Sequence, residues 1–195
     1  MISLASIIAM NLLEPTWDAE VGDRGSVLRA IRLAQPAGAE RLAANLYELE
    51  PGAIVSPLHF HHTNEELLFV MSGTPTLRRG PEQERVLEPG EVVAFPSGPK
   101  GTHQILNRSE TPVRVLICAT NHLPEVAEQV ENETLAVITT AGLRLLPDSP
   151  PITAPRTARS RTSSQPIADG PQRAEVRFRA RALDLVSPSS IPTMM

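Results

Sequence analysis

Short apolar runs separated by Gly- and Pro-containing turns dominate the chain between Arg41 and His122. Runs of β-branched and aliphatic residues recur about every 8 to 12 residues, the spacing typical of strands in a sandwich or barrel. The pattern predicts strands near Leu42–Leu49, Ile54–His61, Glu66–Met71, Thr74–Arg78, Arg85–Leu87, Val92–Phe95, Thr102–Asn107 and Val113–Thr120. So many strands within about 80 residues leave no room for crossover helices, so residues 41–122 are expected to form an antiparallel, all-β barrel.

The segments that flank this block carry other patterns. Residues 11–40 contain an apolar stretch at 27–33 that cannot fold alone, so we expect an N-terminal arm that adds a strand to a sheet edge. That edge belongs either to its own chain or to a neighbour, and a homodimer is expected. Residues 123–149 predict a helix over Pro124–Asn132, because proline and glutamates suit a helix start, and then a hairpin over residues 135–146.

The two ends of the chain give weaker signals. Residues 1–10 are apolar but short and lack a basic residue, so we predict neither a signal peptide nor a membrane span, and we interpret them as a candidate start-site extension. Residues 150–195 are rich in Arg, Ser, Thr and Pro and predict a disordered tail, with a short helix over Arg173–Val186 as the alternative.

Composition and charge narrow the classes of partner. Residues 1–150 carry 11 basic and 19 acidic side chains, net −8, and aromatic residues make up only 3% of the chain. An acidic body with few stacking side chains argues against nucleic-acid binding. The single cysteine, Cys118, excludes an intrachain disulfide and any multi-cysteine metal site, which fits a reducing cytoplasm.

Histidines carry the strongest chemical signal in the sequence. His59 and His61 are two residues apart on a predicted strand, so both imidazoles lie on the same face of that strand. A carboxylate on the next strand and a third imidazole from a later strand, His103, would complete a mixed nitrogen and oxygen site for a divalent first-row metal. Strand alternation does not decide between Glu65 and Glu66, because both faces of residues 67–71 are apolar.

The motifs around these residues resemble those of the cupin superfamily. The first motif of that superfamily is similar to Gly52, His59, His61, Glu66 and Gly73, and the second to Gly90, Pro96, Gly98, His103 and Asn107. Two spacers are longer than in the superfamily pattern, one by one residue and the gap between Gly98 and His103 by two. The resemblance implies a double-stranded β-helix, a jelly-roll-type barrel, with the metal in the barrel mouth.

The resemblance and the residues together lead to two functional hypotheses. The first is a metal-dependent enzyme of the dioxygenase, isomerase or lyase type that acts on a small organic molecule. Its metal ligands would be His59, His61, Glu66 and His103, and its metal would be Fe, Mn, Zn, Ni or Cu. Its candidate proton-transfer residues are His62 and Glu65. The alternative is a non-catalytic module that binds a small sugar or acid in the same pocket.

Overall fold

Strands make up almost all the regular structure in residues 9–23 and 26–146, which are the residues that this computed structural model describes. In chain order the strands are β1 (Ala19–Asp23), β2 (Ser26–Arg32), β3 (Leu42–Leu49), β4 (His59–His61), β5 (Glu66–Ser72), β6 (Thr76–Gly80), β7 (Gln83–Val86), β8 (Val92–Phe95), β9 (Gln104–Leu106), β10 (Val113–Thr120), β11 (Glu125–Gln129), β12 (Thr134–Thr139) and β13 (Gly142–Leu146). The one helical element within these two ranges is a 3-10 turn, η2 (Pro99–Gly101), and no helix there is long and apolar enough to cross a membrane.

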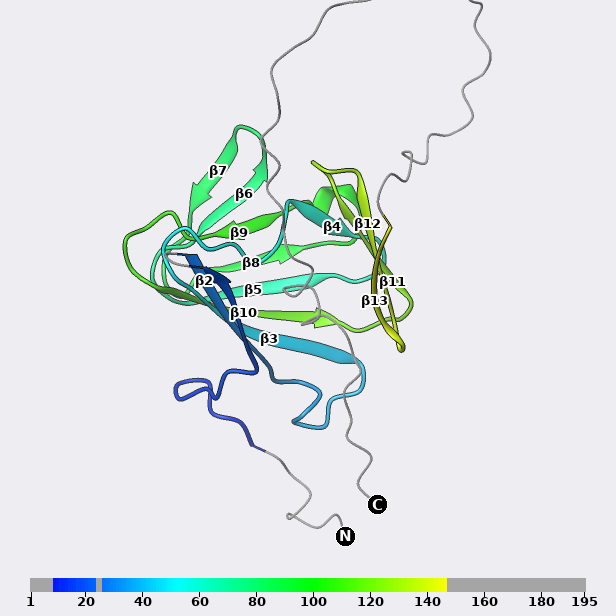
Figure 1. The fold of residues 1–195 in the computed structure, drawn as a ribbon, viewed down its shortest axis with the longest axis horizontal. Helices are drawn as coiled ribbons and strands as arrows, with labels where there is room; N and C mark the ends of the chain where they lie inside the picture. The colour runs from blue at the N-terminus through cyan, green and yellow to red at the C-terminus, as the bar shows by residue number, and fades with distance from the viewer. Residues whose placement is uncertain (1–8, 24–25, 147–195) are drawn as a thin grey trace, which may run out of the picture.

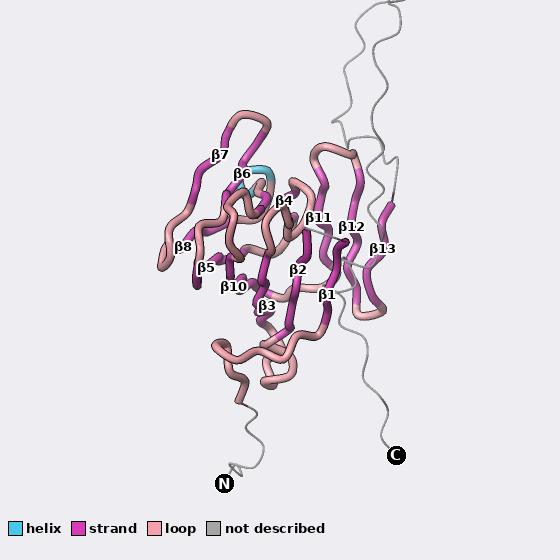
Figure 2. The backbone as a smooth tube through the Cα atoms, turned by 60° about the vertical axis from the view of Figure 1, so that its left-hand side comes forward, coloured by secondary structure: helices cyan, strands magenta, loops and turns pink. Residues whose placement is uncertain are grey.

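The strands form three antiparallel sheets. The largest has the order β1-β2-β3-β10-β5-β8, the second β13-β12-β11-β4, and the third β7-β6-β9. Figure 1 shows the group of β11, β12 and β13 on one side of the barrel and β6 and β7 on the other, and the rotated view of Figure 2 agrees. The all-β, double-stranded β-helix fold expected from the sequence is confirmed.

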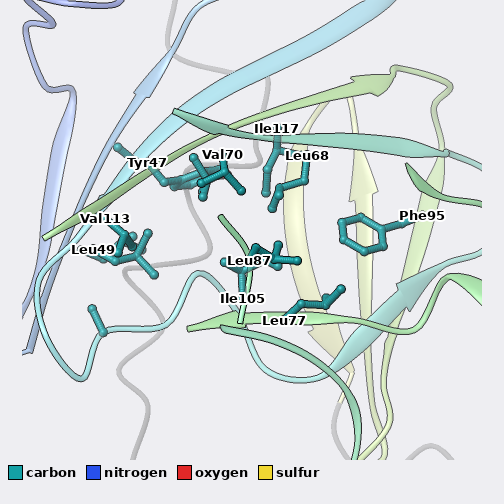
Figure 3. Packing of buried hydrophobic residues seen from close by; sticks show 14 residues of the cluster. Tyr47, Leu49, Leu68, Val70, Leu77, Leu87, Phe95, Ile105, Val113 and Ile117 are labelled. Atoms are coloured by element: carbon teal, nitrogen blue, oxygen red, sulfur yellow. The ribbon is translucent and has the colours of Figure 1, made fainter. Parts of the chain in front are cut away.

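Alternating side chains explain why the central strands form and where the core lies. Along β10, the residues Val113, Val115 and Ile117 are buried, and the residues between them are half-buried. These inward side chains pack with Leu49 of β3 and Leu68 of β5, both 0% exposed, in one aliphatic cluster that Figure 3 shows. Because strand side chains alternate between faces, the residues that β5 and β10 give to this cluster are spaced two apart.

Several strand boundaries match the sequence expectation, and one strand is much shorter than expected. β3, β8 and β10 begin and end at the predicted residues. The predicted strand Ile54–His61 is wrong over its middle, because residues 55–58 form bends and β4 is only His59–His61. Pro57 has no N–H to donate to a ladder, and its carbonyl accepts a hydrogen bond from the His59 ring instead.

The predicted helix over Pro124–Asn132 is wrong, since Glu125–Gln129 forms strand β11. β11 pairs with β12 on one side and with β4 on the other. Its buried residues are Glu125, Ala127 and Gln129, whereas Val126 faces away from the interior. Because two of the three inward side chains are polar, the strand lacks the alternation of apolar and polar residues that identifies a half-buried strand. The hairpin predicted after it is confirmed as β12 and β13.

The N-terminal arm adds strands to a sheet edge of its own chain, which is one of the two alternatives expected from the sequence. β2 pairs with β3, and β1 pairs with β2, so the arm extends the largest sheet by two strands. Trp17 packs in a second apolar cluster with Ile31, Leu33 and Leu46. Three predictions lie outside the described residues. They are most of the start-site extension at residues 1–10, and the disordered tail and the alternative helix within residues 150–195.

Gly73 is expected to be more sensitive to substitution than Gly90, although both have positive φ angles, of 71° and 88°. A Cβ on Gly73 would lie 2.7 Å from Val113 Cγ1 and 2.8 Å from Pro112 O, whereas a Cβ on Gly90 meets nothing within 4 Å. Gly90→Ala therefore incurs only the backbone strain, about 1 to 2 kcal/mol, and Gly73→Ala adds roughly 1 to 3 kcal/mol of overpacking. Urea unfolding of both variants measures the difference, and equal losses would contradict this account.

Candidate metal centre

Two strands from different sheets and one loop bring the predicted metal ligands together. His59 and His61 project from β4, on the opposite side from buried Phe60, and Glu66 is the first residue of β5. His103 directly precedes β9 and forms an antiparallel bridge with His59, in which each backbone N–H donates to the other residue's carbonyl. We call His59, His61, Glu66 and His103 the candidate metal centre.

The nitrogen and oxygen atoms of the centre lie close to one another. His59 Nε2 is 3.2 Å from His61 Nε2, and His61 Nε2 is 3.6 Å from Glu66 Oε1. One ligand atom from each of these three residues lies within 4.8 Å of the ligand atoms of the other two. His103 joins from the other side, with its Nε2 3.2 Å from Glu66 Oε2. The structure therefore groups the ligand atoms of His59, His61 and Glu66 and places His103 against Glu66.

Hydrogen bonds behind the rings fix which nitrogen faces the centre. His59 Nδ1 lies 2.9 Å from Pro57 O, and His103 Nδ1 lies 2.8 Å from Gly101 O. Because a carbonyl oxygen only accepts, each Nδ1 must be the donor, which leaves Nε2 with the lone pair that a metal requires. The Phe95 ring stacks on the His103 ring at 3.8 Å between centroids and further restricts its orientation.

Electrostatics place His59 and Glu66 in the protonation states that metal binding needs. Burial and the neighbouring imidazoles of His103 and His61 lower the pKa of His59 to about 3, so His59 is neutral at neutral pH. Burial acts to raise the pKa of Glu66, but the three imidazoles outweigh it and lower that pKa to about 2. A metal ion binds an imidazole in its neutral form and a carboxylate in its ionised form.

Unpartnered atoms indicate that the centre fits a cation. Glu66 Oε2 is buried without a hydrogen-bond partner, because the short approach of His103 lacks hydrogen-bond geometry. Buried polar atoms are nearly always partnered, and a carboxylate whose two oxygens each face one imidazole nitrogen calls for a positive charge between them. Three imidazoles and one carboxylate suit a divalent first-row transition metal.

Glu125 is the residue near the centre that the sequence did not reveal. It lies on β11, is 2% exposed, and its Oε1 is 3.6 Å from His61 Nδ1. Its carboxylate also accepts the backbone N–H groups of His62, Thr63 and Asn64. These contacts hold the carboxylate behind the His61 ring, on the side away from the other ligands. The carboxylates of Glu125 and Glu66 raise the pKa of His61 above its usual value, although burial acts in the opposite direction.

Glu125→Gln is expected to weaken metal binding by about 10- to 100-fold, because a carboxylate behind a liganding imidazole orients the ring and raises its basicity. Glutamine has nearly the same shape but no charge. The matched control is Glu128→Gln on the same strand, where the carboxylate lies at the surface, 3.3 Å from His62. Competition with a chromogenic chelator measures both affinities, and an equal effect of the two substitutions would contradict the role given to Glu125.

The two candidate proton-transfer residues lie away from the centre. The His62 side chain is 41% exposed, with Nε2 3.3 Å from Glu128 Oε2, and Glu65 is exposed. Neither is among the residues that line the cavity described below. His122 is exposed, and Cys118 is half-buried with a pKa that burial raises. Glu65 directly precedes β5 and is exposed, whereas Glu66, the first residue of β5, lines the cavity.

A cavity of about 630 Å³ opens beside the candidate metal centre. Its wall includes His59, His61, Glu66 and His103 at one end. Most of the rest comes from the largest sheet, from residues 34–40, and from the sheet of β4, β11, β12 and β13. This volume is within the range of pockets that bind small organic molecules.

The fold and the site define a double-stranded β-helix protein with a candidate mixed-ligand metal centre inside its barrel. The family model of the cupin domain matches residues 45–119, which include all four predicted ligands. The chain belongs to the cupin superfamily.

Solved structures agree with this membership. The sugar phosphate isomerase of the cupin superfamily from Silicibacter pomeroyi DSS-3 is 30% identical, with a TM-score of 0.59 over 65% of this chain and 81% of that one. A protein from Acidithiobacillus ferrooxidans ATCC 23270, also described in terms of sugar phosphate isomerisation, is 23% identical, with a TM-score of 0.58 over 67% and 83% of the two chains. The second likeness shows the fold alone. No curated protein sequence matches the chain.

Proposed function

We propose that this protein is a metal-dependent enzyme that acts on a small organic molecule inside the barrel. The observation that carries the proposal is the convergence of three imidazoles and a carboxylate with an unpartnered oxygen on the wall of a 630 Å³ cavity. When bound there, a divalent transition metal would supply Lewis-acid or redox chemistry.

Each residue of the centre has a definite task in this proposal. The Nε2 atoms of His59 and His103 face the centre because their Nδ1–H groups donate to backbone carbonyls. Glu66 contributes a negative charge in a buried position. Four protein ligands leave two positions of an octahedral ion open to substrate, water or dioxygen. Substrate would enter those positions from the cavity.

Three reaction classes suit such a centre: isomerisation, oxygenation and decarboxylation. The 30% identity to the Silicibacter pomeroyi protein, which is described as a sugar phosphate isomerase, supports isomerisation among them. Lewis-acid polarisation of a carbonyl assists removal of a proton from the adjacent carbon, which is the first step of such an isomerisation.

The test is turnover by the metal-loaded protein on a panel of small carbonyl compounds and organic acids. Product isomers are followed by NMR, oxygen uptake by electrode, and carbon dioxide release by a coupled assay. We expect turnover of at least one compound that requires the metal and is lost in His61→Ala. Tight binding of panel compounds without any product or oxygen uptake would overturn the proposal.

The alternative is a binding module that holds a small molecule without converting it. The observation that favours it is the position of His62 and Glu65, since neither predicted proton-transfer residue lines the cavity. The same panel separates the two functions, because a module would bind its ligand with no chemical change.

The proposal includes a cytoplasmic homodimer. The single cysteine supports the cytoplasm. The outer edge of β1, which pairs with no other strand of the described residues, supports self-association, because an edge strand is open to pairing with another chain. Light scattering is expected to give twice the mass of the 21.1 kDa chain. A monomer at every working concentration would refute the dimer.

A further inference from the structure

The wall of the cavity beyond the candidate metal centre is largely apolar. The largest sheet contributes Ala43, Ile117 and Ala119, and the sheet on the other side contributes Ala136, Ile138 and Leu143. Small and aliphatic side chains offer no directional bonds to a ligand, so this part of the wall favours an apolar molecular surface.

The charges that line the cavity are mostly negative. Glu40, Glu66 and Glu125 are among the described lining residues, whereas Arg32 is the one arginine or lysine among them. The Arg32 guanidinium Nε lies 3.9 Å from Asp18 Oδ2, so its charge is balanced by a carboxylate already. A phosphate group is bound in proteins chiefly by arginine, lysine or helix N-termini. The described wall offers little to a phosphate.

Two of the uncharged polar side chains that line the cavity, Asn64 and Gln129, are engaged within the protein. The Asn64 amide donates to the His122 carbonyl and to Glu125, and its oxygen accepts from Thr120 Oγ1. Gln129 Oε1 accepts from Asn132 Nδ2 at 2.7 Å. A sugar needs many free donors and acceptors, because each hydroxyl that is buried without a partner costs binding energy. Because Asn64 and Gln129 Oε1 are already engaged, they are not free to bind the hydroxyl groups of such a ligand.

We propose that the cavity takes a molecule with one metal-binding oxygen head and an uncharged, largely apolar body, and not a phosphorylated sugar. This inference rests on the proposed function, because the head must bind the metal of His59, His61, Glu66 and His103. It departs from the substrate named for the Silicibacter pomeroyi protein. The apolar body lies against the wall formed by the six alanine, isoleucine and leucine side chains named above.

Three hydroxamates with the same chelating head and different bodies test the inference by calorimetry on the metal-loaded full chain. Acetohydroxamate is the reference, hexanohydroxamate adds an apolar tail, and phosphonoacetohydroxamate adds a charged phosphonate. We expect hexanohydroxamate to bind at least tenfold more tightly than acetohydroxamate, since each buried methylene strengthens binding by about fourfold. The phosphonate compound is expected to bind no more tightly than the reference.

Tightest binding of the phosphonate compound would overturn the substrate class and leave the metal function intact. Failure of all three compounds to bind would contradict the metal function, because every head group is a chelator. The two failures are therefore distinguishable.

A matched pair of variants on β13 locates the apolar body. Leu143 is half-buried and lines the cavity, whereas Leu145 is exposed and does not. Leu143→Arg is expected to weaken hexanohydroxamate binding by about tenfold and to strengthen binding of the phosphonate compound, and Leu145→Arg is expected to change neither. Equal effects of the two arginines would overturn the placement of the body.

Discussion

His61→Ala is expected to lower the affinity for divalent transition metals by roughly 100-fold or more. Loss of a residue that only orients a ligand costs about 10- to 100-fold, and His61 is a predicted ligand itself. Its Nε2 lies 3.2 Å from His59 Nε2 and 3.6 Å from Glu66 Oε1, so its removal opens one side of the centre. Chelator competition measures the affinity, and metal analysis after gel filtration measures the occupancy.

Thermal unfolding separates loss of the site from loss of the fold. Metal at a hundredfold excess over its dissociation constant adds about 2.7 kcal/mol to the stability of the native state. His61→Ala should therefore melt like the metal-free parent with or without metal. The control is His122→Ala, because His122 is exposed and outside the cavity wall. Full occupancy in His61→Ala together with loss in His122→Ala would show that the ligands are assigned wrongly.

Leu68→Ala is expected to destabilise the fold by about 2 to 5 kcal/mol, through lost transfer energy and the space left behind. Leu68 is 0% exposed in β5, between β10 and β8, and belongs to the main aliphatic cluster (Figure 3). β5 also begins with Glu66, so this cluster supports the strand that carries a predicted ligand. Urea unfolding measures the loss.

The neighbouring Leu67 is a matched control on the same strand. It is 42% exposed, because consecutive residues of a strand point to opposite faces. Leu67→Ala is expected to change the free energy of unfolding by less than about 1 kcal/mol. Similar losses at the two positions would mean that the burial described for β5 is wrong.

The sequence predicted strands best where the local pattern and the tertiary packing agree. β10 alternates in burial over Val113–Ile117, and both β3 and β10 lie between clear turns, so their bounds follow from the pattern. β11 was missed because it turns Glu125 and Gln129 inward, toward the cavity. A strand that lines a polar site departs from the usual alternation of apolar and polar residues, because the site requires polar side chains at inward positions.

The candidate metal centre also has residues that the sequence predicted and one residue that it did not. The ligands lie in two short segments whose spacing is local, so the pattern of His59, His61, Glu66 and His103 could be found in the sequence alone. Glu125 lies far along the chain from His61, and only the pairing of β11 with β4 brings them together. No local signal in the sequence reports that pairing.

Metal analysis of the full chain, loaded in turn with iron, manganese, nickel, zinc and copper and then gel-filtered, tests the central claim most directly. The account predicts about one equivalent of at least one of these metals per chain, because the ligand atoms of His59, His61 and Glu66 lie within 4.8 Å of one another and His103 Nε2 lies 3.2 Å from Glu66 Oε2. Stoichiometric binding of none of the five metals would contradict it.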